Sequence, residues 1–232
     1  VEPVGGGDVE AILQRIGHPP LPPYIIRARG EEVVGHAKSV EDADREWYQT
    51  VYADASRAGS VAAPTAGLHF TDDLLKRIDH AGVQRINVTL HVGPGTFKSV
   101  TAATLVEHAM HAESFEVTGD NLDKLRHKRG RTIAVGTTSV RALESLPHPL
   151  PERGQNAENC GDFRGMTDLL IAPPFHFRLV DGMLTNFHLP RSTLLALVAA
   201  MVGLERLKTV YQLAIDRGYR FYSYGDAMLI LP

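Results

Sequence analysis

The chain has 232 residues, of which 44% are hydrophobic and 22% are charged, so it can bury a sizeable core without disulfides. Its net charge of −3 excludes a uniformly basic, coat-like nucleic-acid protein but not a local basic groove. The single cysteine, Cys160, cannot form an internal disulfide, which favours a reducing compartment. The longest nearly apolar run, 194–204, is about half of the ~20 residues that a membrane span needs. We therefore expect a cytoplasmic protein without membrane contact.

The first segments read as connectors and loops. Residues 1–23 end in GHPPLPP, where the prolines favour extended backbone. Residues 28–46 are highly charged and are predicted to form a surface excursion. A second loop is predicted at 147–165, which is rich in Pro, Gly and Asn.

Helices and strands are predicted to alternate through the rest of the chain. Thr71 is an N-cap signal, with two acidic residues in the turn that follows. The expected helices are 72–78, 120–130, 140–146, 192–203 and 205–218. The expected strands are 85–92, 131–136, 168–173, 176–180 and 219–231. This alternation predicts an α/β domain.

Polar residues gather at several predicted element ends. Thr65 and His69 lie in APTAGLHFT, beside a glycine that permits close backbone approach. His91 ends a strand that breaks into Gly-Pro-Gly-Thr at 93–96, a turn that commonly shapes a ligand-binding edge. Glu113 follows two histidines in EHAMHAE, which matches no standard zinc motif and reads first as polar surface.

The segment AVGTTSVRALES reads as strand, polar turn and helix. Thr137, Thr138 and Ser139 exceed what one N-cap needs, and free N–H groups at a helix start bind carboxylates or phosphates. Arg141 adds a fork of donors. In TNFHLPRST, Pro190 and Ser192 explain the helix start. Asn186, His188 and Arg191 are surplus to that task, and a rigid helix behind them would hold them at a domain edge.

These segments resemble one family, the S-adenosylmethionine:tRNA ribosyltransferase-isomerases of queuosine biosynthesis. The matching stretches occur in the family's order from Gly17 to Ile230 and include GHPPLPPYI, GSVAAPTAGLHFT, VTLHVGPGTF, HAMHAE, AVGTTSVRALES, LTNFHLPRSTLLALV and YRFYSYGDAMLI. The resemblance implies a large mixed α/β, barrel-like domain at 24–232. Residues 1–23 would be the tail and connector of an inserted small β-barrel domain. The N-terminal part of the family's chain is expected to be absent here.

The resemblance also implies a reaction. The ribosyl part of S-adenosylmethionine is transferred to 7-aminomethyl-7-deazaguanine at the wobble position of a tRNA with a G-U-N anticodon. Isomerisation then gives epoxyqueuosine, with release of adenine and methionine. S-adenosylmethionine would be consumed as a substrate, no cofactor or metal is expected, and the protein is expected to be a monomer.

Residue chemistry suggests how the site would divide this work. Histidine suits proton transfer because its unperturbed pKa is ~6.5, so the catalytic candidates are His91, His69 and then His188. The predicted substrate-binding residues are Thr65, Glu113, Thr137, Thr138, Ser139, Arg141 and Asn186. The predicted tRNA-phosphate contacts are Lys98, Arg126, Arg129 and Arg191.

Two other classes of function stay open at this point. One is a hydrolase that uses a His/Glu pair without tRNA. The other is a truncated, non-catalytic remnant that binds the tRNA anticodon. Adenine release that depends on modified tRNA would separate the transferase from both.

Overall fold

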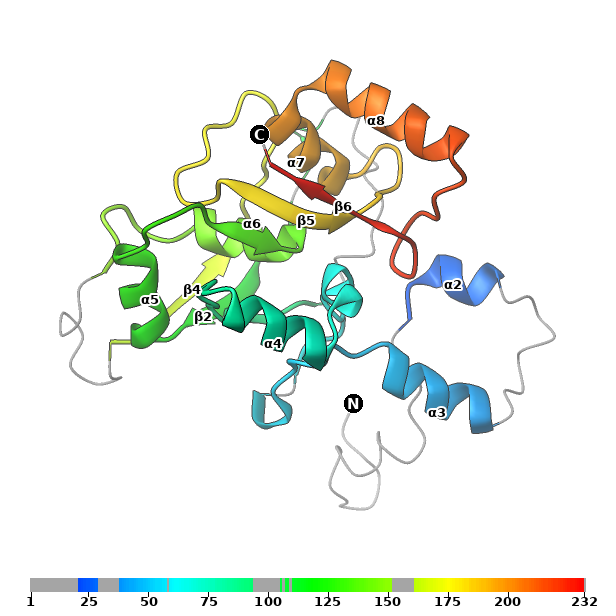
Figure 1. The fold of residues 1–232 in the computed structure, drawn as a ribbon. Helices are drawn as coiled ribbons and strands as arrows, with labels where there is room; N and C mark the ends of the chain where they lie inside the picture. The colour runs from blue at the N-terminus through cyan, green and yellow to red at the C-terminus, as the bar shows by residue number, and fades with distance from the viewer. Residues whose placement is uncertain are drawn as a thin grey trace. The chain divides into compact units, whose positions relative to one another are not determined.

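The computed structural model describes residues 21–28, 38–57, 59–93, 105, 107, 108, 110–151 and 161–231. Contacts between residues divide the chain into two compact units, Val1–Gln49 and Thr50–Pro232 (Figure 1). The described elements of the first unit are the helices α2 (Pro23–Ala28) and α3 (Lys38–Trp47). The second half of the surface excursion predicted over 28–46 contains the helix α3. The predicted domain boundary after residue 23 stays a prediction.

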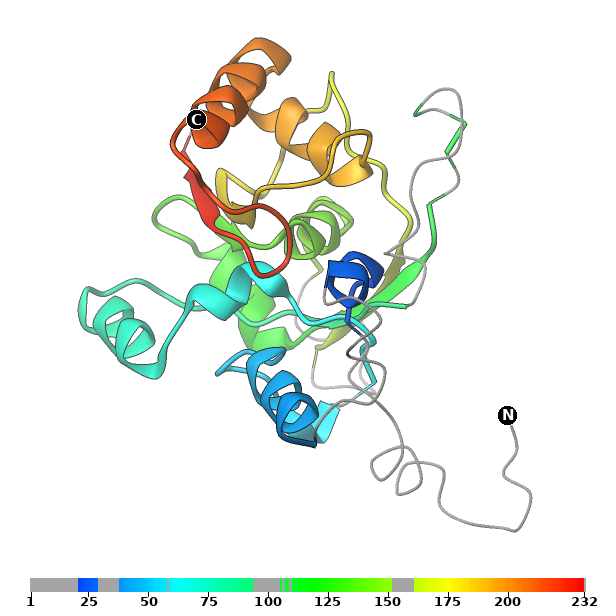
Figure 2. The same ribbon diagram turned by 90° about the vertical axis from the view of Figure 1, so that its right-hand side faces the viewer.

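A three-stranded mixed sheet forms the centre of the second unit. It contains β3 (Ile133–Val135), β5 (Gly182–Asn186) and β6 (Ala227–Ile230), in the order β3-β5-β6. β3 and β5 are parallel, and β5 and β6 are antiparallel. Helices α6 (Thr137–Glu144) and α7 (Thr193–Val202) lie on one side of this sheet, as Figures 1 and 2 show.

A second, antiparallel sheet holds β1 (Thr89–His91), β2 (Glu113–Val117) and β4 (Phe163–Thr167), in the order β1-β2-β4. Helix α5 (Gly119–Arg126) follows β2 directly. Helix α6 packs against β1 of this sheet as well as against β3 and β5. It therefore joins the two sheets.

Local signals in the sequence account for several helix starts. The Thr71 hydroxyl accepts a hydrogen bond from the Leu74 N–H at 3.1 Å and caps α4 (Asp72–His80). The Ser192 hydroxyl caps α7 in the same way, 3.2 Å from the Leu195 nitrogen. Helix α8 (Leu204–Asp216) begins after Gly203, whose φ of 83° lies in the region that favours glycine.

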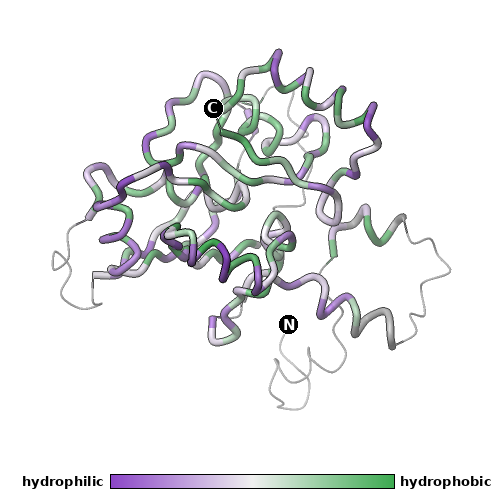
Figure 3. The backbone as a smooth tube through the Cα atoms, in the orientation of Figure 1, coloured by the Kyte–Doolittle hydropathy of each residue, from purple (hydrophilic) through white to green (hydrophobic). Residues whose placement is uncertain are grey.

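The core lies between α5, α6, α7 and the two sheets. Its most buried side chains include Val117, Val140 and Met183, each fully shielded from solvent, and Leu197, which is 1% exposed. Figure 3 shows that hydrophobic residues run along α7 and the C-terminal strand. Burial of this surface stabilises the fold by about 25 cal/mol for each Å² of apolar surface removed from water.

Two predicted strands, 168–173 and 176–180, are wrong. The strands in this region are β4 and β5, and the chain between them is irregular. Pro173 and Pro174 have no N–H to donate to a sheet. The N–H groups of residues 178–180 donate instead to the Glu144 carboxylate, at 2.9, 3.0 and 2.9 Å. A buried side chain on α6 thus replaces the strand partner.

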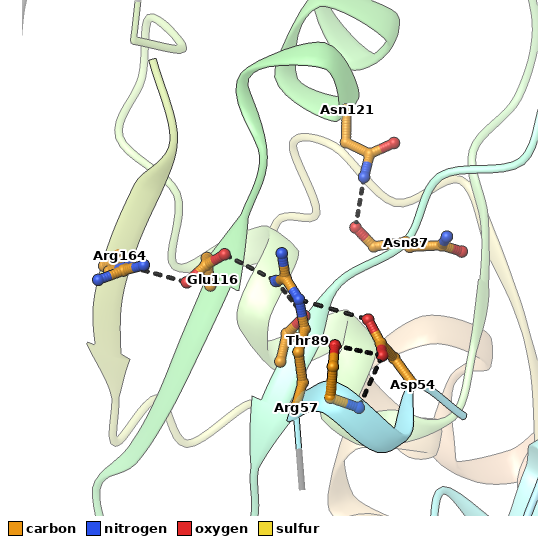
Figure 4. Close-up of polar contacts among 8 residues, drawn as sticks. Asp54, Arg57, Asn87, Thr89, Glu116, Asn121 and Arg164 are labelled. Carbon is orange, nitrogen blue, oxygen red and sulfur yellow. Dashed lines mark hydrogen bonds and ion pairs between the residues drawn. The ribbon is translucent and has the colours of Figure 1, made fainter. Parts of the chain in front are cut away.

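A polar network attaches the segment around Arg57 to the antiparallel sheet (Figure 4). Arg57, at the end of the 3-10 helix η2 (Ala55–Arg57), donates to Glu116 at 2.7 Å and to Thr89 at 3.0 Å. Arg164 donates to the other Glu116 oxygen at 2.8 Å. Arg57 and Glu116 together therefore connect η2 with all three strands of this sheet.

The fold confirms the mixed α/β class. The barrel-like closure and the inserted N-terminal domain stay predictions.

Candidate functional site

A hydrogen-bonded chain joins three of the predicted site residues. The Thr65 hydroxyl donates to Oδ1 of Asn186 at 2.9 Å, and Nδ2 of Asn186 lies 3.5 Å from Nε2 of His69. Asn186 is 3% exposed, whereas His69 is exposed to solvent. With His188, these residues form what we call the β5-end cluster (Thr65, His69, Asn186 and His188). A buried amide therefore positions an accessible imidazole.

The cluster depends on the 3-10 helix η3 (Thr65–His69), which packs against β5. The Gly67 N–H donates to the Pro64 carbonyl at 2.7 Å and closes the first turn of η3. A Cβ added at Gly67 would overlap the Tyr52 hydroxyl and lie 2.9 Å from Cγ2 of Thr50. Only glycine lets η3 approach this segment closely enough to place Thr65 and His69.

His188 lies two residues beyond Asn186 and is held from both sides. Its Nε2 shares a hydrogen bond with the Thr185 hydroxyl at 2.7 Å, and its backbone N–H donates to the Tyr211 hydroxyl at 2.9 Å. Burial lowers the pKa of His188 to about 4. The ring is therefore neutral at neutral pH and is a weak base. This disfavours it as the proton acceptor and suits it to holding the end of β5.

Aromatic residues of α8 and of the C-terminal segment enclose this end of β5. The Phe187 ring packs against Tyr211, Tyr219 and Phe221, with ring centroids 5.5, 5.8 and 5.1 Å away. The Tyr222 N–H donates to the Phe187 carbonyl at 2.8 Å, and Tyr222 has a φ of 74°. Such a backbone conformation is costly for a non-glycine residue and requires support from its surroundings.

Asp226 is a further acidic group near the cluster. Hydrogen bonds from the backbone and side chain of Arg220 lower the pKa of Asp226, with smaller contributions from the Arg220 and His69 charges. Asp226 is therefore a carboxylate in the electrostatic reach of His69. In the sequence, Asp226 is marked only by its place in YGDAM, which is part of the matching stretch YRFYSYGDAMLI.

The start of α6 lies at the same edge of the mixed sheet as the β5-end cluster. β3 and β5 are parallel, with Val135 opposite Leu184, and the Gly136 N–H donates to the Leu184 carbonyl at 2.9 Å. Carboxyl ends of parallel strands meet at one edge. The first N–H groups of α6, at Thr137, Thr138 and Ser139, therefore lie near the end of β5. The Ser139 hydroxyl donates to the Val135 carbonyl at 2.9 Å, so it is used locally.

Arg141 and Glu113 form a buried ion pair. Nη1 of Arg141 lies 2.9 Å from Oε2 of Glu113, and their side chains are 7% and 4% exposed. The same guanidinium donates to the carbonyls of Leu169 and Thr167, at 3.0 and 3.2 Å. Burial raises the pKa of Glu113, and the Arg141 charge opposes that shift. The structure gives both residues partners within the fold, and their direct contact with substrate stays a prediction.

His91 is exposed at the end of β1, an edge strand of the other sheet. Gly59 lies beside it, because a Cβ added there would be 3.2 Å from Nδ1 of His91. The structure brings Thr65, His69 and Asn186 together, places the His188 ring against Thr185, and gives His91 no described contact with any of these residues. Residues 94–96 of the predicted turn after His91, and the predicted tRNA contact Lys98, lie outside the described residues.

The remaining predicted tRNA contacts are Arg126 and Arg129, at and just after the end of α5, and Arg191, just before α7. Arg126 is paired with Asp123 and also donates to the Pro151 carbonyl. Arg129 and Arg191 are exposed, and Arg191 has a φ of 56°. Contact with phosphates stays a prediction for all three.

Among the described residues, no three His, Cys, Asp or Glu side chains are grouped as metal ligands would be. In the same part of the chain, none of the helices combines the length and the apolar character that crossing a bilayer requires.

Fold and site together define a mixed α/β domain with a buried asparagine, an accessible histidine and a helix start at one sheet edge. The sequence model of the family described as queuosine biosynthesis protein matches residues 2–230. The chain therefore belongs to the queuosine biosynthesis protein family.

Individual relatives agree with this assignment. A Gloeobacter violaceus protein named S-adenosylmethionine:tRNA ribosyltransferase-isomerase is 48% identical over 98% of this chain and 59% of its own length. A Halothermothrix orenii protein of the same name is 48% identical over 97% of this chain and 60% of its own length. The crystal structure of S-adenosylmethionine tRNA ribosyltransferase from Thermotoga maritima superposes with a TM-score of 0.57 at 45% identity. That superposition covers 72% of this chain and 51% of the other. The chain thus spans less than two thirds of the length of these relatives.

Proposed function

We propose that this chain carries the catalytic centre of an S-adenosylmethionine:tRNA ribosyltransferase-isomerase. The substrates would be S-adenosylmethionine and a tRNA with a G-U-N anticodon that holds 7-aminomethyl-7-deazaguanine at the wobble position. The products would be epoxyqueuosine in the tRNA, adenine and methionine. S-adenosylmethionine would be consumed as a substrate rather than act as a cofactor. Family membership and the names of the relatives support this proposal.

The observation that carries the proposal is the Thr65–Asn186–His69 chain of polar contacts at the end of β5. The reaction needs a base that removes a proton beside the sulfonium, and a separate proton donor for adenine, which leaves with the electrons of its glycosidic bond. His69 is the best placed base, because its ring is exposed and is positioned by a buried amide. Thr65 holds that amide and is itself a positioning residue.

The start of α6 would hold the methionine carboxylate. Three consecutive N–H groups and the helix dipole favour an anion there. Thr138 would supply the side-chain donor, because the Ser139 hydroxyl is bonded to the Val135 carbonyl. Arg141 would act through Glu113 and the carbonyls of Thr167 and Leu169, by fixing the orientation of α6.

The test measures adenine release from S-adenosylmethionine with tRNA that carries the modified base, with unmodified tRNA, and without tRNA. The chain is assayed alone and together with the polypeptide that the Gloeobacter violaceus relative has outside the matched region. Release only with modified tRNA supports the transferase. Release without tRNA would indicate a hydrolase, and tRNA binding without release under either condition would indicate a non-catalytic remnant.

A further inference from the structure

The carboxylate of Asp226 lies beside the β5-end cluster. β6 begins at Ala227, and Ala227 is paired with Asn186 across the sheet. Asp226 therefore directly precedes the residue opposite Asn186, whose amide nitrogen lies 3.5 Å from Nε2 of His69. The side chain of Asp226 is 31% exposed, so it is partly shielded from solvent. An acidic group thus stands next to the amide that positions the proposed base.

A closed loop fixes the position of this carboxylate. Oδ2 of Asp226 accepts a hydrogen bond from the Arg220 N–H at 2.7 Å, and the Asp226 N–H donates to the Arg220 carbonyl at 2.8 Å. Gly225 lies inside the loop, where an added Cβ would be 2.4 Å from the carbonyl oxygen of Phe221. The loop is therefore tightly closed and holds Asp226 at the start of β6.

Oδ1 of Asp226 keeps room for another donor. Nη2 of Arg220 lies 3.3 Å from this oxygen, and the Arg220 side chain is 77% exposed. An exposed ion pair of this kind contributes little to stability. The two oxygens of a carboxylate offer about four lone-pair sites. Asp226 can therefore accept a hydrogen bond from an imidazole N–H while its bonds within the loop persist.

The elements around His69 carry several titratable groups. Burial raises the pKa of Tyr52, which approaches η3, to about 12 and lowers the pKa of His188 to about 4, so both are neutral at neutral pH. The acidic and basic groups are Asp72 and Asp73 at the start of α4, and Arg220 and Asp226 in the C-terminal loop. Hydrogen bonds from Arg220 lower the pKa of Asp226 most, and the His69 charge lowers it further. Asp226 and His69 are therefore within electrostatic range of each other.

We propose that Asp226 is a positioning residue for His69, which accepts a hydrogen bond from Nδ1–H and leaves Nε2 as the basic nitrogen. The Thr65 hydroxyl donates to Oδ1 of Asn186, so the amide turns its Nδ2 towards Nε2 of His69. A donor that faces Nε2 favours the tautomer with the proton on Nδ1. The amide and the carboxylate would thus select the same tautomer from opposite sides of the ring.

This role rests on the proposed function, because it supports the base of that reaction. When Nε2 takes the proton beside the sulfonium, the electrons of the C–H bond stay on the carbon and the imidazole becomes a cation. Asp226 takes no proton in this step. It stays a carboxylate and stabilises the cation, as the aspartate of a Ser-His-Asp triad does for its histidine.

The experiment reads the tautomer of His69 from the NMR shifts of its ring nitrogens. The chain carries isotope-labelled histidine and is studied at about pH 8, where an ordinary histidine is neutral. The His69 signals are assigned by comparison with His69→Asn. We expect the proton on Nδ1 in the parent and largely on Nε2 in Asp226→Asn, where the asparagine oxygen keeps the hydrogen bond from the Arg220 N–H. Asp226→Glu should recover part of the Nδ1–H form.

The rate of adenine release gives the second readout. Single-turnover rates are measured with modified tRNA and with the polypeptide that the Gloeobacter violaceus relative has outside the matched region. Asp226→Asn should lower the rate at least about tenfold, since an aspartate that fixes a catalytic tautomer can contribute up to about 10,000-fold. Asp216→Asn changes an exposed carboxylate at the end of α8 and should match the parent in both readouts.

An Nδ1–H tautomer that persists in Asp226→Asn, with the variant shown to be folded by circular dichroism, would overturn the inference. An Nε2–H tautomer in the parent, or adenine release from Asp226→Asn at the parent rate, would overturn it as well. The expected tautomer change in a parent chain that releases no adenine would support the contact between Asp226 and His69 and count against the proposed function. The tautomer is measured without catalysis, so the two failures are distinguishable.

Discussion

Oγ1 of Thr65 lies 2.9 Å from Oδ1 of Asn186, although the two residues are 121 positions apart in the chain. This contact joins η3 to the end of β5 and gives the buried Asn186 amide a fixed orientation. The other end of the amide faces His69. The proposed centre therefore depends on the tertiary fold of the second unit, because η3 lies near its start and Asn186 lies on a strand 121 positions later.

The first prediction separates the two leading histidines. His69→Ala should lower the rate of adenine release by roughly 100- to 10,000-fold, the usual contribution of a positioned general base. Asn186→Ala should lower the same rate by a smaller factor, because it removes the group that orients His69. The measurement is the single-turnover rate with modified tRNA.

His91→Ala serves as the comparison, since the described structure joins His91 to no member of the β5-end cluster. A loss of activity confined to His91→Ala, with His69→Ala near the parent rate, would move the proposed base to the edge of the other sheet.

The second prediction concerns stability at acidic pH. The pKa of His188 is about 4 in the folded protein and ~6.5 in the unfolded chain, so the unfolded state binds more protons between these values. Stability should therefore fall as the pH decreases from 6.5 towards 4, by about 2 kcal/mol between pH 7 and pH 5. Urea unfolding across this range measures the slope.

The slope should be reduced in His188→Asn and kept in His80→Asn, which changes an exposed histidine at the end of α4. Equal slopes in the parent and in His188→Asn would show that another group is responsible.

The third prediction concerns the buried Arg141–Glu113 pair. Arg141→Ala should lower the free energy of unfolding by about 3–5 kcal/mol, because it leaves a buried carboxylate without its partner. Lys208→Ala should change it by less than about 1 kcal/mol, because its partner Glu205 is 87% exposed. Denaturant titration measures both.

The double variant Arg141→Met/Glu113→Leu should recover part of the loss, since it leaves no unpaired charge. If Arg141→Ala lowered the free energy of unfolding by less than Lys208→Ala does, the pair would have no stabilising role.

The fourth prediction concerns the approach of η3 to the segment beneath it. Gly67→Ala should destabilise the protein by about 1–3 kcal/mol, because the new Cβ would overlap Tyr52. It should also reduce adenine release, since Thr65 and His69 lie on the displaced helix. Gly130→Ala is the matched control, as an added Cβ there meets nothing within 4 Å.

Combining Gly67→Ala with Tyr52→Ala should restore part of the stability, and a double-mutant cycle would show this as coupling between the two positions. Additive effects would mean that the glycine is required for another reason.

The sequence by itself determined the elements whose causes are local. Thr71 and Ser192 each cap the helix that follows, because a hydroxyl can reach the N–H three residues ahead within one turn. The mixed α/β class followed from the same periodicity. The sequence also singled out polar residues at strand ends as site candidates, because polar side chains in excess of capping needs stand out against an apolar run.

Only the tertiary structure decided which of those residues meet. The N–H groups of residues 178–180 donate to the carboxylate of Glu144, which lies on α6. The apolar pattern of 176–180 therefore predicted a strand that does not form. Arg141 proved to be a buried partner of Glu113, a residue 28 positions away. The physical reason is that hydrogen bonds and ion pairs act over a few ångströms in space, whereas periodicity and capping act over a few residues along the chain.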